Sequence, residues 1–146
     1  MKLSTKSRYG TRAMMDIAMR SNGGSSMLKD IAERQAVSPK YLDHILSALR
    51  KAGLLKNTRG KGGGYSLTRP AFSITMKDII EAVDGSLAPV ECVDNPNICN
   101  RVPTCATNDL WKRLKVAIED VLESTTLESL TECQEKKKPQ TINYTI

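Results

Sequence analysis

Long apolar runs are missing from this sequence of 146 residues. No stretch approaches the roughly 20 apolar residues that cross a bilayer, and the N-terminus lacks the apolar core of a signal peptide. We therefore expect a soluble, cytoplasmic protein with no membrane partner. In a reducing cytosol, four cysteines favour metal binding or redox chemistry over structural disulfides.

Histidine and aromatic residues are also scarce, with one histidine, one tryptophan, one phenylalanine and four tyrosines. A single histidine, His44, leaves no Ser/His/Asp set for nucleophilic catalysis. The glycine run at 62–64 lacks the Gly-Lys-Ser/Thr ending of a phosphate loop, and no long apolar strand precedes it. The sequence therefore predicts that the protein is not an enzyme.

Positive charge is concentrated in the first half of the chain. The whole chain carries 22 Lys and Arg against 16 Asp and Glu, a net charge of +6. Residues 1–70 hold 14 of the basic and 4 of the acidic residues, which gives +10, whereas residues 71–146 have a net charge of −4. This asymmetry is typical of a half that binds nucleic acid, and a merely solubilising surface is the weaker explanation.

The stretch from Ser38 to Tyr65 carries the strongest pattern. Ser38 is a suitable N-cap, and Pro39 fits the first helical position, where its missing N–H costs nothing. An apolar face at helical spacing consists of Tyr41, Leu42, Ile45, Leu46 and Leu49. The polar face can present hydrogen-bonding groups to base edges in a major groove, through Lys40, Asp43, His44, Ser47 and Arg50. Gly53 is placed to end this helix.

Two short strands, 54–57 and 65–68, are expected after this helix, with a flexible cationic tip between them at 58–64. The tip contains Arg59, Gly60 and Lys61, and an arginine there could enter a minor groove, whose negative potential attracts it. A helix followed by a basic hairpin is the layout of a winged helix-turn-helix. An ordinary amphipathic helix followed by a loop is the alternative.

Three further helices complete an expected DNA-binding domain over residues 1–85. The first runs from about residue 7 to 20 and ends at the breaker cluster 21–25. The second runs from about 28 to 35 and meets the recognition helix across a tight turn at 36–38. Thr75 with Asp78 forms a capping-box-like pair that begins the fourth, and Gly85 ends it.

Residues 86–106 change character, because prolines and asparagines make regular structure unfavourable there. Three of the four cysteines lie in this loop, spaced Cys92–x6–Cys99–x5–Cys105. The paired knuckles of structural zinc sites are absent, and three thiolates on one loop suit an iron–sulfur cluster whose fourth ligand is not cysteine. A thiol–disulfide switch and three unrelated cysteines are alternatives that the spacing leaves open.

A long helix and a short following helix are expected over residues 107–133. The apolar stripe of the long helix is broader than a lone surface helix needs, and its coiled-coil-like spacing includes Trp111, Leu114, Ile118 and Val121. We interpret it as a dimerisation helix rather than a helix packed on its own domain. Thr125 and Glu128 are expected to form a capping box for the short helix, and residues 134–146 a flexible tail.

With these patterns, the chain resembles the Rrf-two family of bacterial winged-helix regulators, and within it the IscR type. The resemblance covers nearly the whole chain and is carried by MKLSTKSRYGTRAM, SPKYLDHILSALRKAGLL, RGKGGGY, the three loop cysteines and CATNDLW. It implies a homodimer that binds palindromic operators in double-stranded DNA. It also implies an iron–sulfur cluster, 2Fe–2S in preference to 4Fe–4S, on Cys92, Cys99 and Cys105. The implied base contacts come from Ser38, Lys40, Tyr41 and Asp43, with Arg59 in the wing.

Two positions depart from the family pattern. Asn108 stands where the IscR type has a histidine ligand, and Arg8 stands where nitric-oxide-sensing relatives use an aspartate from the other subunit. Asparagine is a poor iron ligand. The fourth ligand therefore stays open between Asp109, Asp94, Glu91, Cys133, Asn108 and a water.

Taken together, the sequence predicts a mainly α-helical protein with a small β wing, in which a winged helix-turn-helix domain precedes a long dimerisation helix. The expected function is that of a homodimeric transcriptional regulator, a repressor, whose operator affinity is controlled by a cluster that senses iron, redox state or nitric oxide. The alternative is a cluster-free regulator of the same fold, gated by thiol oxidation or by a partner protein. An enzyme of iron–sulfur chemistry that binds nucleic acid is disfavoured by the missing catalytic residues.

Overall fold

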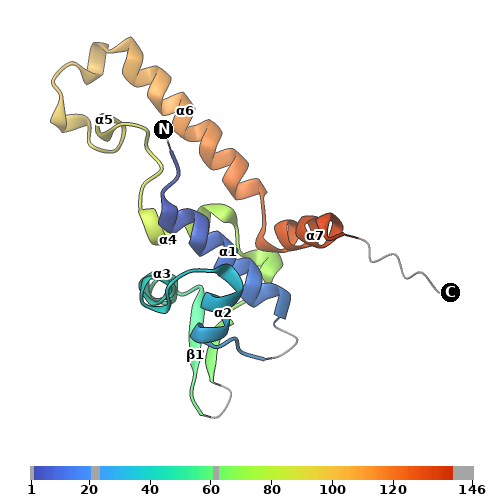
Figure 1. Cartoon of the computed structure of the whole chain (residues 1–146). Coiled ribbons are helices and arrows are strands. Elements are labelled where there is room, and N and C mark those ends of the chain that lie inside the picture. The colour runs from blue at the N-terminus through green and yellow to red at the C-terminus, as the bar shows by residue number, and fades with distance from the viewer. Residues whose placement is uncertain (1, 21–23, 61–62, 140–146) are drawn as a thin grey trace.

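The structure is a computed structural model that describes residues 2–20, 24–60 and 63–139. It is mainly helical with a small two-stranded sheet, as the sequence predicts (Figure 1). In chain order the described elements, with η for a 3-10 turn, are α1 (Thr5–Arg20), α2 (Leu28–Gln35), α3 (Pro39–Lys51), β1 (Leu55–Thr58), β2 (Gly64–Leu67), η1 (Ala71–Ser73), α4 (Met76–Asp84), α5 (Glu91–Asp94), η2 (Pro96–Ile98), η3 (Val102–Thr104), α6 (Ala106–Ser124) and α7 (Leu127–Lys137).

Some predicted features lie outside the described residues. These are residues 21–23 of the breaker cluster, Lys61 in the expected wing tip and residues 140–146 of the expected tail. The division of the chain at residues 85, 106 and 133 stays a prediction.

Helices α2 and α3 form the expected helix-turn-helix. Ala36 ends α2 in the left-handed region at φ +53°, and its N–H donates to carbonyls of the last turn. The chain then re-enters a helix at Ser38, whose Oγ accepts from the N–H of Tyr41 at 3.2 Å. Pro39 occupies the first helical position. The predicted N-cap and first-turn proline of the recognition helix are thus confirmed.

The hydrophobic core lies between α1, α3 and α4. Its fully buried side chains include Met14, Ile17, Leu42, Ile45, Leu46, Leu49 and Ile79. Four of these form the predicted apolar face of α3, whereas Tyr41 is only half-buried. Gly10 lets α1 approach this face, because a Cβ there would lie 3.3 Å from Cγ2 of Ile45. Burial of each Leu or Ile stabilises the domain by about 1.5–3 kcal/mol, so α3 is held by its buried side and its polar side is left for other contacts.

The wing is an antiparallel hairpin of β1 and β2, in which Leu55 pairs with Leu67 at one end. Each strand is displaced by one residue from its predicted position. The cause is the end of α3, where Gly53 at φ +81° lets the Leu54 N–H bond the Leu49 carbonyl at 3.0 Å. The N–H of Leu54 therefore belongs to the hydrogen bonding that ends α3 after its C-cap Ala52, and β1 begins one residue later.

A third segment joins this sheet in a way that the sequence did not indicate. Ser26, just before α2, exchanges two backbone hydrogen bonds with Tyr65 of β2, at 2.9 and 2.8 Å. The wing is therefore attached to the helix-turn-helix on both sides, by the end of α3 and by the start of α2.

A backbone bridge attaches the C-terminal helices to the winged-helix domain. The predicted capping box of Thr75 and Asp78 begins α4. The Met76 N–H donates to the Thr125 carbonyl at 2.9 Å, and the Leu127 N–H donates to the Ile74 carbonyl at 2.8 Å. The predicted capping box of Thr125 and Glu128 is wrong, because Thr125 ends α6 and Thr126 is the N-cap of α7.

Residues 86–105 are more regular than predicted. They contain α5 and the 3-10 turns η2 and η3, because a proline at the start of each 3-10 turn and local backbone bonds support short helical turns. Helix α6 begins at Ala106, one residue before the predicted start, and α7 continues to Lys137. Residues 134–137, predicted to lie in a flexible tail, therefore belong to a helix.

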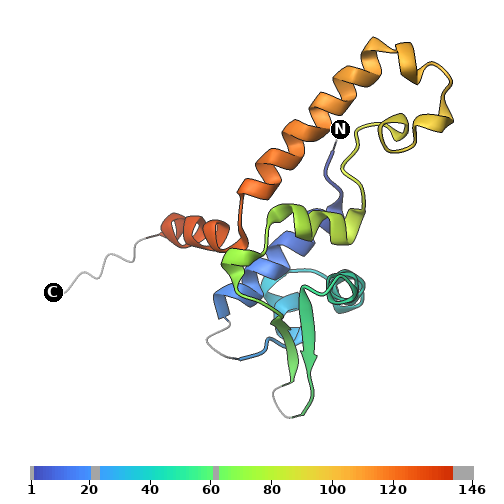
Figure 2. The ribbon, with the colours of Figure 1, turned by 180° about the vertical axis from the view of Figure 1, so that it is seen from behind.

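The wing and the cysteine-bearing loop lie at opposite ends of the molecule, as both views show (Figures 1 and 2). Helix α6 extends away from the winged-helix domain, and α5 with its loop packs beside the N-terminal end of α6. Helix α7 leads back to the domain and packs against α1. In the part of the chain that the structure describes, no helix is both long and apolar enough to span a membrane.

Candidate nucleic-acid interface and cysteine loop

The polar face of α3 is directed away from the core. Its predicted contact residues Ser38, Pro39, Lys40, Asp43, His44 and Arg50 are all exposed. Tyr41 differs, because its ring packs edge-on against Tyr9 at 6.0 Å between centroids, and the guanidinium of Arg12 lies 5.3 Å from the Tyr9 centroid. The packing between α1 and α3 thus orients one of the predicted base-reading side chains.

Asp43 is exposed to solvent and also contacts the wing. The Tyr65 hydroxyl of β2 donates to its Oδ1 at 3.5 Å, the outer limit of a hydrogen bond. Burial raises the pKa of Tyr65, and the neighbouring Asp43 charge raises it further, so the phenol stays protonated and continues to donate. One carboxylate oxygen is thereby oriented, and the other remains free to accept from a cytosine amino group.

The cations of this surface are open to solvent. Lys40, Arg50 and, at the wing, Arg59 are exposed, and the described residues supply no ion-pair partner for any of them. Gly60 is likewise exposed, at φ +105°. Cations without intramolecular partners can neutralise phosphates at little cost, so the α3 face and the wing together form a surface suited to a DNA duplex.

The three loop cysteines have different environments. Cys92 lies half-buried in α5, Cys99 is exposed after η2, and Cys105 is half-buried at the N-cap position of α6. The hydroxyl of Thr107 lies 3.1 Å from the Cys105 thiol and lowers its pKa, assisted by backbone N–H groups of Asn108 and Thr107. Cys133 is exposed on α7, at the opposite end of α6.

No ready-made metal cage is present among the described residues. No group of three or more His, Cys, Asp or Glu side chains there is arranged to hold an ion. All four cysteines are free thiols. The donor set still fits an iron–sulfur cluster, because three thiols share one loop and the Asn108 amide donates to one of them, Cys92. Metal sites often assemble their ligands only when the metal binds.

The loop is fastened to α6 by an ion pair. Lys115 lies 3.1 Å from the carboxylate of Asp94, and hydrogen bonds from Ser86 and Lys115 lower the pKa of Asp94. The predicted dimer residues of α6 are only partly covered by their own chain, because Trp111, Leu114 and Ile118 are half-buried and Val121 is 64% exposed. The assignment of this stripe to a dimer interface stays a prediction.

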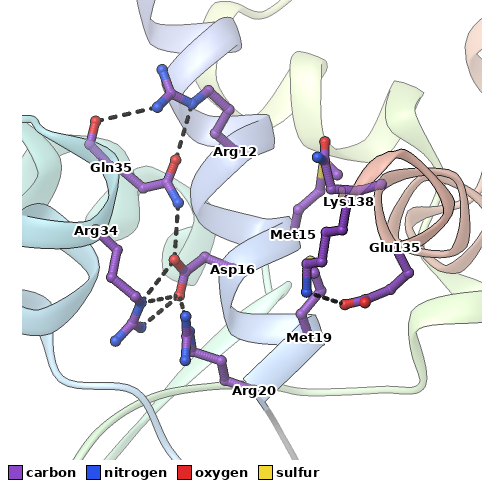
Figure 3. Close-up of a pocket in the computed structure, with 10 residues that line it drawn as sticks. Arg12, Met15, Asp16, Met19, Arg20, Arg34, Gln35, Glu135 and Lys138 are labelled. Atoms are coloured by element: carbon purple, nitrogen blue, oxygen red, sulfur yellow. Dashed lines mark hydrogen bonds and ion pairs between the residues drawn. The ribbon is translucent and has the colours of Figure 1, made fainter. Parts of the chain in front are cut away.

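A pocket of about 610 Å³ lies between α1, α2 and α7 (Figure 3). Asp16 of α1 is buried and accepts from Arg34 at 2.6 Å and from Gln35 at 2.9 Å, while Met15 and Met19 point toward α7. Burial raises the pKa of Asp16, but the hydrogen bonds from Arg34 and Gln35 outweigh it and leave the pKa below 3.8. These contacts lock α1 to α2.

Substitution Asp16→Asn should destabilise the fold and reduce its sensitivity to acid. The carboxylate contributes stability above its unfolded pKa, and this contribution is lost as pH falls through the lower folded pKa. We expect a loss of about 1.5–3 kcal/mol at pH 7, the range for hydrogen bonds to charged groups, and a smaller loss at pH 3. Urea unfolding at both pH values measures this. The exposed Asp30→Asn is the control, and equal losses at both pH values would contradict the assignment.

Two features escaped the sequence patterns. An acidic residue inside the apolar face of α1 was a usable signal for the buried Asp16, since such a position predicts a paired charge. Asn108 gave no such signal, because its neighbours in the sequence are polar, yet the structure buries it completely.

Comparisons with known proteins agree with this architecture. A family model described as "Rrf2: Iron-dependent Transcriptional regulator" matches residues 3–133. A relative from Vibrio vulnificus, the HTH-type transcriptional regulator IscR, is 42% identical over 89% of this chain and 77% of its own length.

Two solved structures are similar over most of both chains. The B. subtilis global cysteine regulator CymR superposes with a TM-score of 0.76 at 39% identity, covering 91% of this chain and 98% of that one. The IscR of T. potens gives the same TM-score and identity, covering 96% of this chain and 93% of that one.

Proposed function

The chain belongs to the Rrf2 (Rrf-two) family of winged-helix transcriptional regulators, and on that premise we propose that it is a homodimeric repressor whose operator affinity is controlled by an iron–sulfur cluster. The family consists of regulators rather than enzymes, in agreement with the missing catalytic residues. The cluster, the dimer and the palindromic operator are the proposed parts.

The proposal of DNA binding is supported by the presence of an exposed polar helix face and an exposed cationic wing in the same domain. The N-terminal end of α3 presents Ser38, Lys40 and Asp43, and the wing presents Arg59. A recognition helix of this kind reads base edges in the major groove through its N-terminal residues. An arginine at the wing reaches the adjacent minor groove, where it senses groove width and potential.

The cluster would be held by Cys92, Cys99 and Cys105, with 2Fe–2S preferred to 4Fe–4S. When bound, such a group supplies a redox centre whose assembly also depends on iron supply. The loop consists of short helical turns with little apolar content, so binding of a metal would bring its three thiols together and change the arrangement of these turns.

Helix α6 connects the loop to the DNA-binding domain. Lys115 and Asp94 join the loop to its first half, and the 3.0 Å pair of Lys77 with Glu123 joins its second half to α4. The bridge between Ile74 and Leu127 follows directly. A change in the arrangement of the loop therefore acts on a helix that is fastened to the winged-helix domain, and through the dimer it changes the spacing of the two recognition helices.

A second function rests on the free thiols. A cluster-free regulator gated by thiol oxidation or by a partner protein fits the absence of a ready-made metal cage in the described ranges and the lowered pKa of Cys105. It is also supported by similarity to the Staphylococcus aureus CymR, which was solved in an oxidized form and matches with a TM-score of 0.72 at 39% identity over 90% of this chain and 97% of that one.

The DNA-binding proposal predicts different effects for the wing and the helix. Arg59→Ala should weaken binding to all sequences and reduce the slope of log affinity against log salt by about 1. Asp43→Ala should relax sequence preference by about 1–3 kcal/mol at one base pair. Fluorescence anisotropy on a duplex selected from a random library, and on unrelated duplexes, measures both effects.

The control is Lys112→Ala, which removes one exposed cation from the first half of α6, outside the helix-turn-helix and the wing. It should bind like the parent. If Arg59→Ala and Asp43→Ala also bound both kinds of duplex like the parent, the proposed docking would be wrong.

A further inference from the structure

Asn108 has the most unusual environment in the C-terminal half of the chain. It lies in the first turn of α6 and has no exposed surface, whereas the apolar residues of the same helix are half-buried or exposed. Burying an amide costs free energy unless its polar atoms are paired. This polar burial therefore requires an explanation beyond packing.

The side chain of Asn108 contacts one of the three loop cysteines, Cys92. Its Nδ2 lies 3.3 Å from the Cys92 carbonyl oxygen and 3.3 Å from the Cys92 Sγ. Cys92 and Asn108 are 16 positions apart in the sequence, so this contact joins the start of the cysteine loop to the first turn of α6.

The other side-chain atom, Oδ1, is buried without a hydrogen-bond partner, and it is the only such side-chain N or O atom among the described residues. The orientation of the amide follows from chemistry, since the Cys92 carbonyl only accepts and must face the amide N–H₂ rather than the oxygen. An unsatisfied buried acceptor costs about 1–3 kcal/mol. A carbonyl oxygen in this state can bind a proton donor or a metal ion.

We propose that Asn108 Oδ1 is the fourth protein ligand of the cluster held by Cys92, Cys99 and Cys105, an inference that rests on the proposed function. The oxygen donates a lone pair to the iron and no proton or electron is transferred. Because the amide is neutral, the site carries one negative charge less than a four-thiolate site, which favours a higher reduction potential. Amide oxygen is a poor match for iron, so this ligand exchanges readily.

The other protein candidates are less suitable in this structure. The Asp94 carboxylate is already paired with Lys115. Glu91 and Asp109 are exposed, so neither has a buried oxygen that lacks a hydrogen-bond partner. Cys133 lies on α7, beyond the far end of α6. Asn108 combines a hydrogen bond to the candidate ligand Cys92 with an acceptor that lacks a partner.

The test uses the full chain, reconstituted anaerobically with ferrous iron and sulfide and then reduced. Pulsed EPR in oxygen-17-labelled water detects a water ligand through its hyperfine coupling. The parent should show no such coupling, and Asn108→Ala should show it, because water takes the vacated position. The half-life of the Asn108→Ala cluster in a chelator should fall at least about tenfold, as for losses of groups that support a metal site.

Two further variants make the outcome decisive. Asn108→Asp keeps an oxygen ligand and adds a negative charge, so it should show no water coupling and a lower reduction potential than the parent. Asn100→Ala, an exposed asparagine between Cys99 and Cys105, is the matched control and should behave like the parent. If Asn108→Ala holds no cluster, the test rests on Asn108→Asp. A reduction potential of its cluster equal to that of the parent cluster overturns the assignment.

The failures can be told apart. Water coupling in the parent, or an Asn108→Ala spectrum and half-life equal to those of the parent, overturns the ligand assignment and leaves the cluster in place. A reconstituted parent that contains no iron overturns the proposed cluster and this assignment together.

Discussion

Replacing Ile118 with glutamate should convert the proposed dimer into monomers. Helix α6 has 19 residues, and its apolar stripe is left half-buried or exposed by its own chain. Pairing with a symmetry mate would bury this stripe, and a carboxylate at its centre would then be buried without a partner. A loss of about 3 kcal/mol weakens the dimer more than a hundredfold, enough to dissociate it at micromolar concentration. Sedimentation velocity measures the change directly.

The same helix offers a matched control for the dimer. Val116 is 53% exposed and points away from the predicted stripe, so Val116→Glu adds the same charge to the same helix and should leave the dimer intact. Circular dichroism of both variants checks that the helices persist. An unchanged dimer for Ile118→Glu, or dissociation by Val116→Glu alone, would place the interface on another face of the molecule.

Replacing any one of Cys92, Cys99 and Cys105 with alanine should abolish the visible absorption of the proposed cluster, and Cys133→Ala should preserve it. The reason is positional. Cys105 is the N-cap residue of α6, the Cys92 thiol accepts from Asn108 in the first turn of α6, and Cys99 lies between them in the same loop. Cys133 is an exposed residue of α7, which packs on α1. Anaerobic absorption spectra with iron and sulfide analysis measure the outcome.

Cys133→Ala serves as the control for general effects of thiol removal. The loop variants should remain folded dimers with altered operator affinity, because the loop adds little to the hydrophobic core. A parent without iron, or a Cys133 variant that loses the cluster while a loop variant keeps it, would contradict the prediction. One equivalent of zinc on the same thiols would indicate a different metal, and reconstitution with iron and sulfide separates a mismetallated sample from a zinc site.

The sequence by itself determined the winged helix-turn-helix, because its signals act within a few residues. Ser38 and Pro39 begin α3, Gly53 ends it, and Thr75 with Asp78 begins α4, each through contacts with the adjacent turn. The apolar face of α3 followed from helical spacing alone, and four of its five residues are buried. Local hydrogen bonding and periodicity are short-range properties, and one chain is enough to reveal them.

The tertiary structure decided the features that depend on contacts distant in the sequence. Ser26 joins the wing through Tyr65, and the pairing of Thr75 with Thr126 moves the cap of α7 away from Thr125. Asn108 is buried because α5 folds against the start of α6, and this brings its amide to Cys92. The periodicity of the sequence does not predict a contact between distant residues, because the free energy that such a contact gains depends on how the rest of the chain is folded. The spacing of the cysteines therefore made them candidate ligands and left Asn108 one of several candidates for a fourth, whereas the contact between Asn108 and Cys92 appears only in the fold.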